Sequence, residues 1–371
     1  MIRVLHVVGS MDRGGIETFL MNVYRNINRN EIQFDFLTHS EGNHAFDDEI
    51  RKLGGRIYTI PNRSKGIFKN KKSLDNFFKK HTEYQIVHEH SSSLSYIEPL
   101  KYAQKYGVPV RIIHSHSSRQ SGKKINKYFH YLNRTKISNI ATDFFAASDE
   151  AAKWLFDKEM FNTKNYHIIK NGIDTRNFLY NEQIREEVRQ ELNLSENQIV
   201  IGHVGRLTYA KNHLFLLELF RKYQEINPNS RLLLVGDGEL KDYISNLVQE
   251  LGLEKFVILT GSTSNVSSLL QAMDIFIFPS HFEGLGISLI EAQSTGLPCI
   301  ASTNVPSEVR VTDNISFLNL DSNFEIWIEE INSMLNNNRR KSRNFEVINS
   351  GFDIKNVAKN LSVFYANSIN N

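Results

Sequence analysis

Short apolar runs alternate with longer amphipathic segments along the whole chain. The first apolar run covers Ile2–Val8, and the segment after it repeats apolar residues at the spacing of one helix face: Ile16, Phe19, Leu20, Val23 and Ile27. Further strands are predicted at Ile32–Leu37, Gln85–His88, Val110–His114 and Asp143–Ala146. This βαβ alternation predicts parallel sheets that are covered by helices.

The same pattern starts again at Ile199–Val204, a strand that ends in Gly205. Later strands are predicted at Arg231–Val235, Phe256–Thr260, Asp274–Phe278 and Leu297–Ala301. Near-continuous apolar strands of this kind are buried on both faces. Between the halves, Asn171-Gly172 signals a turn. We therefore expect two Rossmann-like, doubly wound α/β domains over 1–168 and 169–351, followed by a weak helix over 352–371.

Two such domains predict a ligand in the cleft between them, because open α/β sheets bind ligands beyond the carboxyl ends of their strands. The length of 371 residues suits roughly two domains. With 40% hydrophobic and 23% charged residues, the composition excludes disordered and collagen-like chains.

Cys299 is the only cysteine, which excludes an intramolecular disulfide and disfavours a thiolate metal cluster. No apolar run reaches the roughly 18 residues of a membrane span. The N-terminus lacks the apolar core and cleavage site of a signal peptide. These features predict a cytoplasmic protein.

Charge is distributed unevenly along the chain. Residues 1–165 carry an excess of nine positive charges, and residues 166–371 carry an excess of six negative ones. The region from Arg63 to Lys136 holds 16 basic and 4 acidic residues. A basic face of this kind suits a membrane surface, a phosphorylated substrate or nucleic acid, although an ordinary solvated surface explains it equally well.

Candidate chemistry lies at the predicted strand ends. Gly14-Gly15 follows the first strand at a helix N-terminus, where backbone N–H groups can approach an anion, unless the pair only forms a tight turn. It is not a G-x-G-x-x-G motif, which disfavours a dinucleotide site. Arg206 and Lys211 follow the first strand of the second half and can converge on one diphosphate, or form a solvated pair.

The segment His281–Glu291 follows the strand Asp274–Phe278 and is the most informative stretch. Gly284 and Gly286 flank a predicted helix start, so their N–H groups can face a phosphate or a sugar. Glu291 falls about two turns into that helix, beside the apolar Ile287, Ile290 and Ala292. A carboxylate at that depth suits a vicinal diol such as a ribose, and Glu283 can reach sugar hydroxyls. Balance of the helix dipole explains Glu283 equally well.

Taken together, these residues resemble family 4 of the retaining glycosyltransferases, which has the GT-B fold. The motifs that carry the resemblance are the Glu283/Glu291 pair, the Arg206/Lys211 pair, Gly14-Gly15 and Asn171-Gly172-Ile173-Asp174. The likeness is strongest over about 165–305 and moderate over 1–25 and 105–150.

The resemblance implies that the second domain binds a nucleotide sugar, with UDP favoured and GDP possible. Arg206 and Lys211 would hold the diphosphate, and Gly14 and Gly15 would approach it. Glu291 would hold the ribose, and Glu283 with the backbone of Gly284, Leu285, Gly286 and Ile287 would hold the donor sugar. The final helix would cross back to the first domain.

The family also places a histidine at the end of a strand of the first domain, close to the donor sugar. His116, followed by small hydroxyl residues, matches that pattern better than His114, which remains open. The expected reaction transfers a hexosyl or N-acetylhexosaminyl group with retention by same-face displacement. No metal is expected, because the two cations can take its place and no D-x-D triplet occurs.

The acceptor should bind to the basic first domain. Within Ser121–Arg134, one helical face is apolar (Ile125, Tyr128, Phe129, Leu132) and basic residues surround it (Lys123, Lys124, Lys127, Arg134). Such a helix can lie on an anionic membrane, or simply pack on the sheet. Membrane binding would suit a lipid-linked saccharide acceptor and synthesis of a cell-surface or capsular polysaccharide by a peripheral enzyme. No nucleic-acid motif is evident.

Two other functions stay open. A nucleotide-sugar epimerase or phosphorylase on the same fold is one, although a phosphorylase would need a lysine-bound cofactor in a longer chain. A non-catalytic sugar-nucleotide sensor or inactive partner subunit is the other. The acids, the cations and the cleft histidine that the resemblance assigns argue against an inactive protein.

Overall fold

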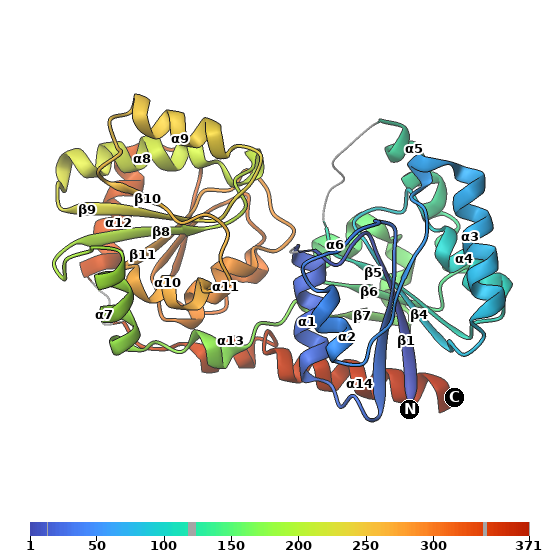
Figure 1. The fold of residues 1–371 in the computed structure, drawn as a ribbon. Coiled ribbons are helices and arrows are strands. Elements are labelled where there is room, and N and C mark those ends of the chain that lie inside the picture. The colour runs from blue at the N-terminus through green and yellow to red at the C-terminus, as the bar shows by residue number, and fades with distance from the viewer. Residues whose placement is uncertain (13, 118–123, 337–339, 371) are drawn as a thin grey trace. The chain divides into compact units, whose positions relative to one another are not determined.

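The computed structural model describes residues 1–12, 14–117, 124–336 and 340–370. The chain forms two compact units, Met1–Ile173 with Gly351–Asn371, and Asp174–Ser350. The first unit begins with the N-terminus and also contains the last helix, which lies beside the first helix (Figure 1). The junction falls five residues later than the expected 168/169 boundary.

The first unit holds a parallel sheet of seven strands among the described residues, in the order β3-β2-β1-β4-β5-β6-β7. The strands are β1 Ile2–Val8, β2 Ile32–Thr38, β3 Ile57–Thr59, β4 Ile86–Ser91, β5 Val110–Ser115, β6 Asp143–Ala146 and β7 Tyr166–Ile168. The helices are α1 Gly15–Asn26, α2 Asp47–Lys52, α3 Ile67–Lys80, α4 Glu98–Lys105, α5 Lys124–Arg134, α6 Asp149–Leu155 and α14 Ile354–Asn370.

The second unit holds a parallel sheet of six strands in the part of the chain described, in the order β10-β9-β8-β11-β12-β13. The strands are β8 Ile199–Val204, β9 Ser230–Val235, β10 Val257–Leu259, β11 Ile275–Phe278, β12 Cys299–Ser302 and β13 Ile315–Leu318. The helices are α7 Glu182–Glu191, α8 His213–Ile226, α9 Lys241–Glu250, α10 Val266–Ala272, α11 Ile287–Ser294, α12 Phe324–Asn336 and α13 Asn344–Asn349. The predicted doubly wound α/β architecture is therefore confirmed in both halves.

Alternating side chains of β1 fill two separate apolar layers, one on each face of the first sheet. Val4 packs with α1 and α14, and Leu5 packs with the helices of the opposite face. The last helix therefore completes the core of the first unit, with Ile354 and Tyr365 fully buried. Burial of these apolar side chains stabilises the contact between α14 and the sheet.

The Asn171-Gly172 junction has a steric reason that the turn signal did not show. A Cβ at Gly172 would lie 2.9 Å from the Cα of Ile354, so only glycine lets the start of α14 approach the chain. Ile173 then pairs with the same segment: its N–H donates to the Phe352 carbonyl at 2.8 Å, and its carbonyl accepts from Ile354 at 2.9 Å.

Three strands escaped the sequence analysis: β3, β7 and β13. β3 and β7 have three residues each and are only half-buried, and all three strands lie at sheet edges. Their runs are too short and too polar to stand out from loops.

Candidate active site

The second sheet reverses its strand order between β8 and β11, since β9 and β10 lie on one side of β8 and β11 to β13 lie on the other. Ligands of doubly wound sheets bind at this switch point, beyond the carboxyl ends of the strands. The loop after β8 carries Arg206 and Lys211, and the loop after β11 carries Glu283 and Gly286. The predicted cations and acids of this unit therefore meet at one sheet edge.

Lys211 and Glu283 form an ion pair across these two loops. The ammonium Nζ lies 2.7 Å from Glu283 Oε1, and the two side chains are only 16% and 11% exposed. The same ammonium lies 4.5 Å from the ring centroid of Phe278, the last residue of β11. The sequence placed Lys211 on a diphosphate and Glu283 on a sugar, and the structure brings the two groups together.

A backbone hydrogen bond and a pair of stacked rings join the loop after β8 to the loop after β11. The His281 N–H donates to the Ala210 carbonyl at 2.8 Å, and the rings of Tyr209 and His281 stack with centroids 4.6 Å apart. Asn212 then starts α8 in the left-handed conformation, with φ of 55°. Lys211 is therefore fixed at the end of a short turn rather than carried on a free loop.

Arg206 is exposed, and its guanidinium makes no hydrogen bond or ion pair with any described residue. The loop that carries it is pressed against the loop after β9, because a side chain at Gly236 or Gly238 would overlap backbone atoms of Gly205 and Leu207. The closely packed loop therefore presents the exposed Arg206 guanidinium as a donor that no described residue occupies.

Gly286 is the N-cap of α11 and has φ of 94°, a conformation that favours glycine. A Cβ atom added at Gly286 would also lie 3.2 Å from the Phe278 ring. Gly284 is half-buried and Leu285 buried, and Ile287 is the first helical residue. The first N–H groups of a helix have no partner inside it, so this helix start can donate to an anion or a hydroxyl.

Glu291 is the fifth residue of α11, so it lies just over one turn into the helix, not two turns as expected. The helix begins at Ile287, because Gly284–Gly286 are still loop. Burial raises the pKa of the Glu291 carboxyl to about 7. Its carboxyl oxygens form no hydrogen bond with the described residues. Glu291 is half-buried, and a partly desolvated carboxyl without a partner among the described residues can accept hydrogen bonds from a ligand.

The first unit has its own switch point, between β1 and β4. A pocket of about 380 Å³ opens there, and its lining includes Gly9, His39, Glu89, Ser91, Tyr96 and Asn126. Glu89 is 4% exposed, and its Oε2 has no hydrogen-bond partner in the described chain. Burial and the nearby charge of Glu98 raise its pKa to about 8. The carboxyl is therefore largely protonated at neutral pH.

Sequence analysis missed this pocket. The signal that could have found it is the polar run His88–Ser93, which follows an apolar strand start directly at a carboxyl end. Hydroxyl, amide and carboxyl groups that converge on a pocket suit a polyhydroxylated ligand.

Gly14 is the N-cap of α1 and Gly15 is its first residue, as the motif predicted. Gly14 is extended, with φ of −131°, so no left-handed conformation requires glycine there. The carboxylate of Glu17 folds back over Gly14, and burial raises its pKa. The Glu17 carboxylate therefore lies over the helix N-terminus, at the place where the sequence predicted that the anion of a ligand would bind. The sequence analysis did not single out Glu17.

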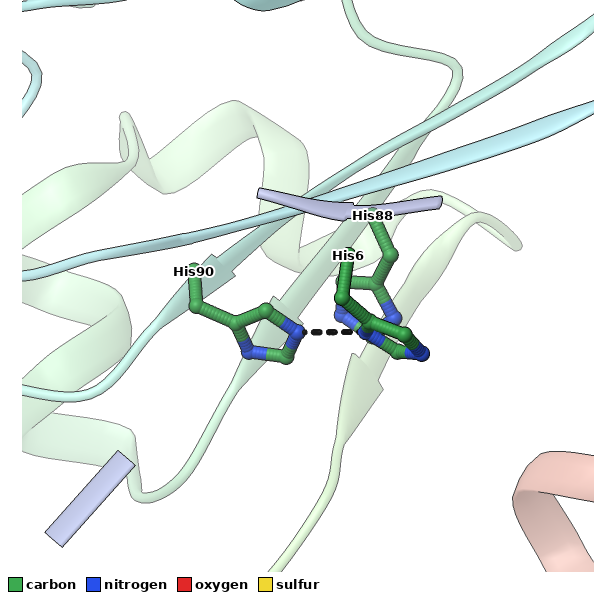
Figure 2. A group of neighbouring side chains, drawn as sticks. All are labelled: His6, His88 and His90. Carbon is green, nitrogen blue, oxygen red and sulfur yellow. Dashed lines mark hydrogen bonds between the residues drawn. The ribbon is translucent and has the colours of Figure 1, made fainter. Parts of the chain in front are cut away.

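Five histidines lie in a row on the face of the first sheet that packs against α1 and α14. They come from β1, from β4, from β5 and from the residue just after β5: His6, His88, His90, His114 and His116. Figure 2 shows three of them, with the hydrogen bond between His6 and His90. His114 is fully buried inside β5, whereas His116 follows the strand and is half-buried. Of the two predicted candidates, His116 is thus the one nearer to solvent.

Two family descriptions match most of the chain between them. "Glycosyltransferase Family 4" matches residues 13–177, and "Glycosyl transferases group 1" matches residues 184–347. The putative glycosyltransferase EpsF of Bacillus subtilis is 34% identical over 334 residues, which cover 89% of this chain and 86% of that protein. The chain belongs to the GT-B glycosyltransferases.

Other glycosyltransferases align along nearly the whole chain. The capsular polysaccharide biosynthesis glycosyltransferase CapH of Staphylococcus aureus is 28% identical, over 98% of this chain and 99% of that protein. Among solved structures, Anabaena HepE in complex with UDP superposes with a TM-score of 0.79 at 19% identity, over 99% of this chain and 100% of that one. The structural likeness confirms the GT-B fold, and glycosyl transfer is the activity of the family.

Proposed function

We propose that this glycosyltransferase moves a hexosyl or N-acetylhexosaminyl group from a UDP-sugar to a saccharide or lipid-linked saccharide, with retention of configuration, as a member of family 4. The observation that carries the proposal is the Lys211–Glu283 pair at the β8/β11 switch point, together with Arg206 and Glu291, whose side chains have no hydrogen-bond partner among the described residues. Phosphate, sugar and ribose each have a suitable group at that one edge.

The roles of the two cations follow from the place where negative charge develops during the reaction. When the sugar leaves, negative charge grows on the diphosphate, and Lys211 and Arg206 stabilise that charge. Gly14 and Gly15 contribute N–H groups to the same diphosphate. The two cations supply the charge that a divalent metal supplies in other transferases, so the reaction proceeds without one.

The remaining roles are assigned by hydrogen-bonding capacity. Glu291 holds the ribose hydroxyls, and Glu283 with the backbone of Gly284–Ile287 holds the donor sugar. His116 lies at the donor sugar. The pocket at Glu89 takes the acceptor, because its hydroxyl, amide and carboxyl groups suit a saccharide.

The names of two relatives support the donor and the pathway. One relative is a UDP-Gal:alpha-D-GlcNAc-diphosphoundecaprenol alpha-1,3-galactosyltransferase of Escherichia coli, 27% identical over 90% of this chain and 86% of that protein. CapH acts in capsular polysaccharide biosynthesis. We infer that this enzyme builds a cell-surface or capsular polysaccharide on the inner face of the cell membrane, with a UDP-sugar favoured over a GDP-sugar.

A membrane surface fits the outer face of the first unit. No helix in the described ranges is long and apolar enough to cross a bilayer. Instead, the apolar face of α5 points to solvent, with Tyr128 66% exposed, while His130 and Asn133 of the same helix are buried. The helix packs on the first unit through His130 and Asn133, which both hydrogen-bond to the backbone of Leu94, and it leaves its apolar face exposed. Ser121–Lys123 of the predicted amphipathic segment lie outside the described residues.

The start of α3 extends this apolar face. Phe68 is 90% exposed, and Arg63, just before α3, lies 5.8 Å from the Phe129 ring of α5. Lysines lie just before α3 at Lys65, within α3 at Lys69 and within α5 at Lys127. Exposed aromatic side chains with surrounding lysines are the composition of an interfacial, anionic-lipid-binding surface.

The test is acceptor-dependent release of UDP from a panel of UDP-, GDP- and ADP-sugars, with the anomeric configuration of the product read by NMR. Retained configuration and release that requires both substrates support transfer. An epimerised sugar nucleotide without an acceptor would show the epimerase, and binding without any turnover would show a non-catalytic protein.

A further inference from the structure

The five histidines of the first unit are joined by hydrogen bonds into two chains. In the first, His6 Nδ1 lies 2.9 Å from His90 Nε2, and His90 Nδ1 lies 2.9 Å from His116 Nε2. In the second, His114 Nδ1 lies 3.2 Å from His88 Nε2, and His88 Nδ1 lies 2.8 Å from the Tyr365 hydroxyl of α14. Figure 2 shows the inner end of the first chain.

All five rings are electrically neutral at physiological pH. Burial lowers the pKa of each, to about 3 for His6 and His116. The groups packed around the rings are aromatic: Phe19 of α1, Phe34 and Phe36 of β2, Phe145 of β6 and Tyr365 of α14. A neutral imidazole has one N–H donor and one bare nitrogen acceptor.

This rule gives the first chain a single direction. Because both nitrogens of His90 are bonded to histidines, His90 donates at one nitrogen and accepts at the other, and the whole chain runs one way. The two ends are His6 Nε2 and His116 Nδ1, both buried and without a normal hydrogen bond in the described chain. One of these two nitrogens carries a hydrogen that has no histidine acceptor.

The position of Asn171 indicates the direction of the hydrogen bonds in the first chain. Its Oδ1 is buried and has no hydrogen-bond partner in the described chain, as is also true of His116 Nδ1, and the Asn171 side chain raises the pKa of His116 in the way that a nearby hydrogen-bond acceptor does. If His116 Nδ1 carries the hydrogen, that N–H has an acceptor beside it. The reverse direction would leave an N–H of His6 buried against Phe34, whose ring centroid is 4.1 Å away, with no acceptor. A buried N–H without a partner is costly.

We propose that His6 and His90 are positioning residues that hold His116 as its Nδ1–H tautomer, so that His116 acts as a neutral hydrogen-bond donor and not as a general base. His6 donates to His90, His90 donates to His116, and the Nδ1–H of His116 faces Asn171 or a ligand oxygen. The role toward the donor sugar rests on the proposed function, whereas the tautomer is a property of the protein alone.

A metal site is the competing explanation of the same residues. Two triads, His6/His88/His90 and His90/His114/His116, have ligand atoms within 4.8 Å of one another. Both triads include His90, whose two ring nitrogens are already bonded. A divalent ion at either triad would therefore have to replace one of the hydrogen bonds of His90.

The experiment is long-range ¹⁵N–¹H NMR of the full chain labelled with ¹⁵N-histidine, with His116 assigned from the His116→Asn spectrum. We expect a single Nδ1–H tautomer for His116, and we expect the ring to stay uncharged down to about pH 5. The Nε2–H tautomer, a mixture of tautomers, or charging of His116 near pH 6–7 would overturn the proposal. Stoichiometric Zn²⁺ binding that shifts these rings would also overturn it, in favour of a metal site.

Two variants at His6 separate positioning from packing, because His6 contacts neither His116 nor the pocket. His6→Leu removes the donor, and His6→Asn keeps an amide N–H near the Nδ1 position. We expect a mixture of His116 tautomers and a several-fold lower kcat in His6→Leu, with both restored in His6→Asn. Equal behaviour of the two folded variants would contradict the proposal. If His6→Leu does not fold, the wild-type spectrum still decides, and it does so without any turnover.

Discussion

The ammonium of Lys211 and the carboxylate of Glu283 lie 2.7 Å apart at the carboxyl edge of the second sheet, one from the loop after β8 and one from the loop after β11. In the unliganded enzyme, the residue proposed to hold the diphosphate is thus neutralised by the residue proposed to hold the sugar. The pair gives each of these two largely buried charges a partner of opposite sign.

Removal of the Lys211 ammonium should therefore slow the chemical step. We expect Lys211→Ala to lower kcat about 10²–10³-fold, because one donor to the developing charge is lost. Lys222→Ala is the matched control, since Lys222 forms an exposed ion pair with Glu325 on the same unit. Steady-state kinetics of UDP release check both variants, and normal turnover of Lys211→Ala would remove the assigned role.

Donor binding should depend on the ionisation of Glu291. Burial raises the pKa of Glu291 to about 7, and the ionised form is the better acceptor for ribose hydroxyls. Affinity for a UDP-sugar should rise as pH increases from 6 to 8, and binding should release protons below pH 7. Calorimetry in buffers of different ionisation enthalpy measures the release. Glu291→Gln should lose the pH dependence, and an unchanged dependence in that variant would contradict the assignment.

The stability of the first unit should fall as pH rises. The folded pKa of Glu89 is raised to about 8 from its ordinary 4.5, so between these values the folded state holds a proton that the unfolded state has lost. Stability is therefore fully present below pH 4.5 and is lost toward pH 8, by an amount on the order of 2–4 kcal/mol.

Trp154 of α6 reports this unfolding selectively once Trp327 of the second unit is replaced by Phe. In that background, Glu89→Gln should flatten the pH dependence and raise stability at pH 8. Denaturant unfolding followed by Trp154 fluorescence makes the comparison. A carboxyl that titrates normally would give equal curves for both proteins.

Glu17 should compete with the donor for the start of α1. Its carboxylate covers Gly14, where the diphosphate is proposed to bind. Removing one negative charge at a helix N-terminus should strengthen anion binding there by roughly 2–5-fold. We expect that gain for UDP in Glu17→Gln and none in Glu31→Gln, a control beyond the other end of the helix. Weaker binding of UDP by Glu17→Gln would count against the Gly14-Gly15 assignment.

The exposed apolar face of α3 and α5 should direct membrane binding. Replacement of Phe68 and Tyr128 by Ser should abolish co-sedimentation with vesicles that contain anionic lipid. Phe345→Ser changes a comparably exposed ring on the second unit and should leave binding intact. Equal sedimentation of both variants would exclude this face as the membrane-binding surface.

The strands that build each sheet could be predicted because β1, β8 and β11 are almost entirely apolar. The short edge strands could not be predicted, because so few half-buried residues show no periodicity.

The residues of the candidate site also fall into a group that the sequence could place and a group that it could not. Glycines and charges at strand ends are typical of a ligand-binding edge, so the sequence could place Arg206, Lys211 and Glu283 together at one edge of the second sheet.

Contacts that depend on side-chain direction were beyond the sequence. The pairing of Lys211 with Glu283, the return of Glu17 over Gly14 and the burial of Glu89 are all set by tertiary packing. The face of α5 shows the same point: its periodicity was correct, but periodicity does not say whether an apolar face meets a sheet or solvent.

The most direct test is a crystal structure of the enzyme with an intact UDP-sugar bound. We expect diphosphate oxygens within hydrogen-bonding distance of Lys211 Nζ and the Arg206 guanidinium, with the ribose hydroxyls on Glu291. A diphosphate that contacts neither cation would contradict the roles proposed for Arg206 and Lys211.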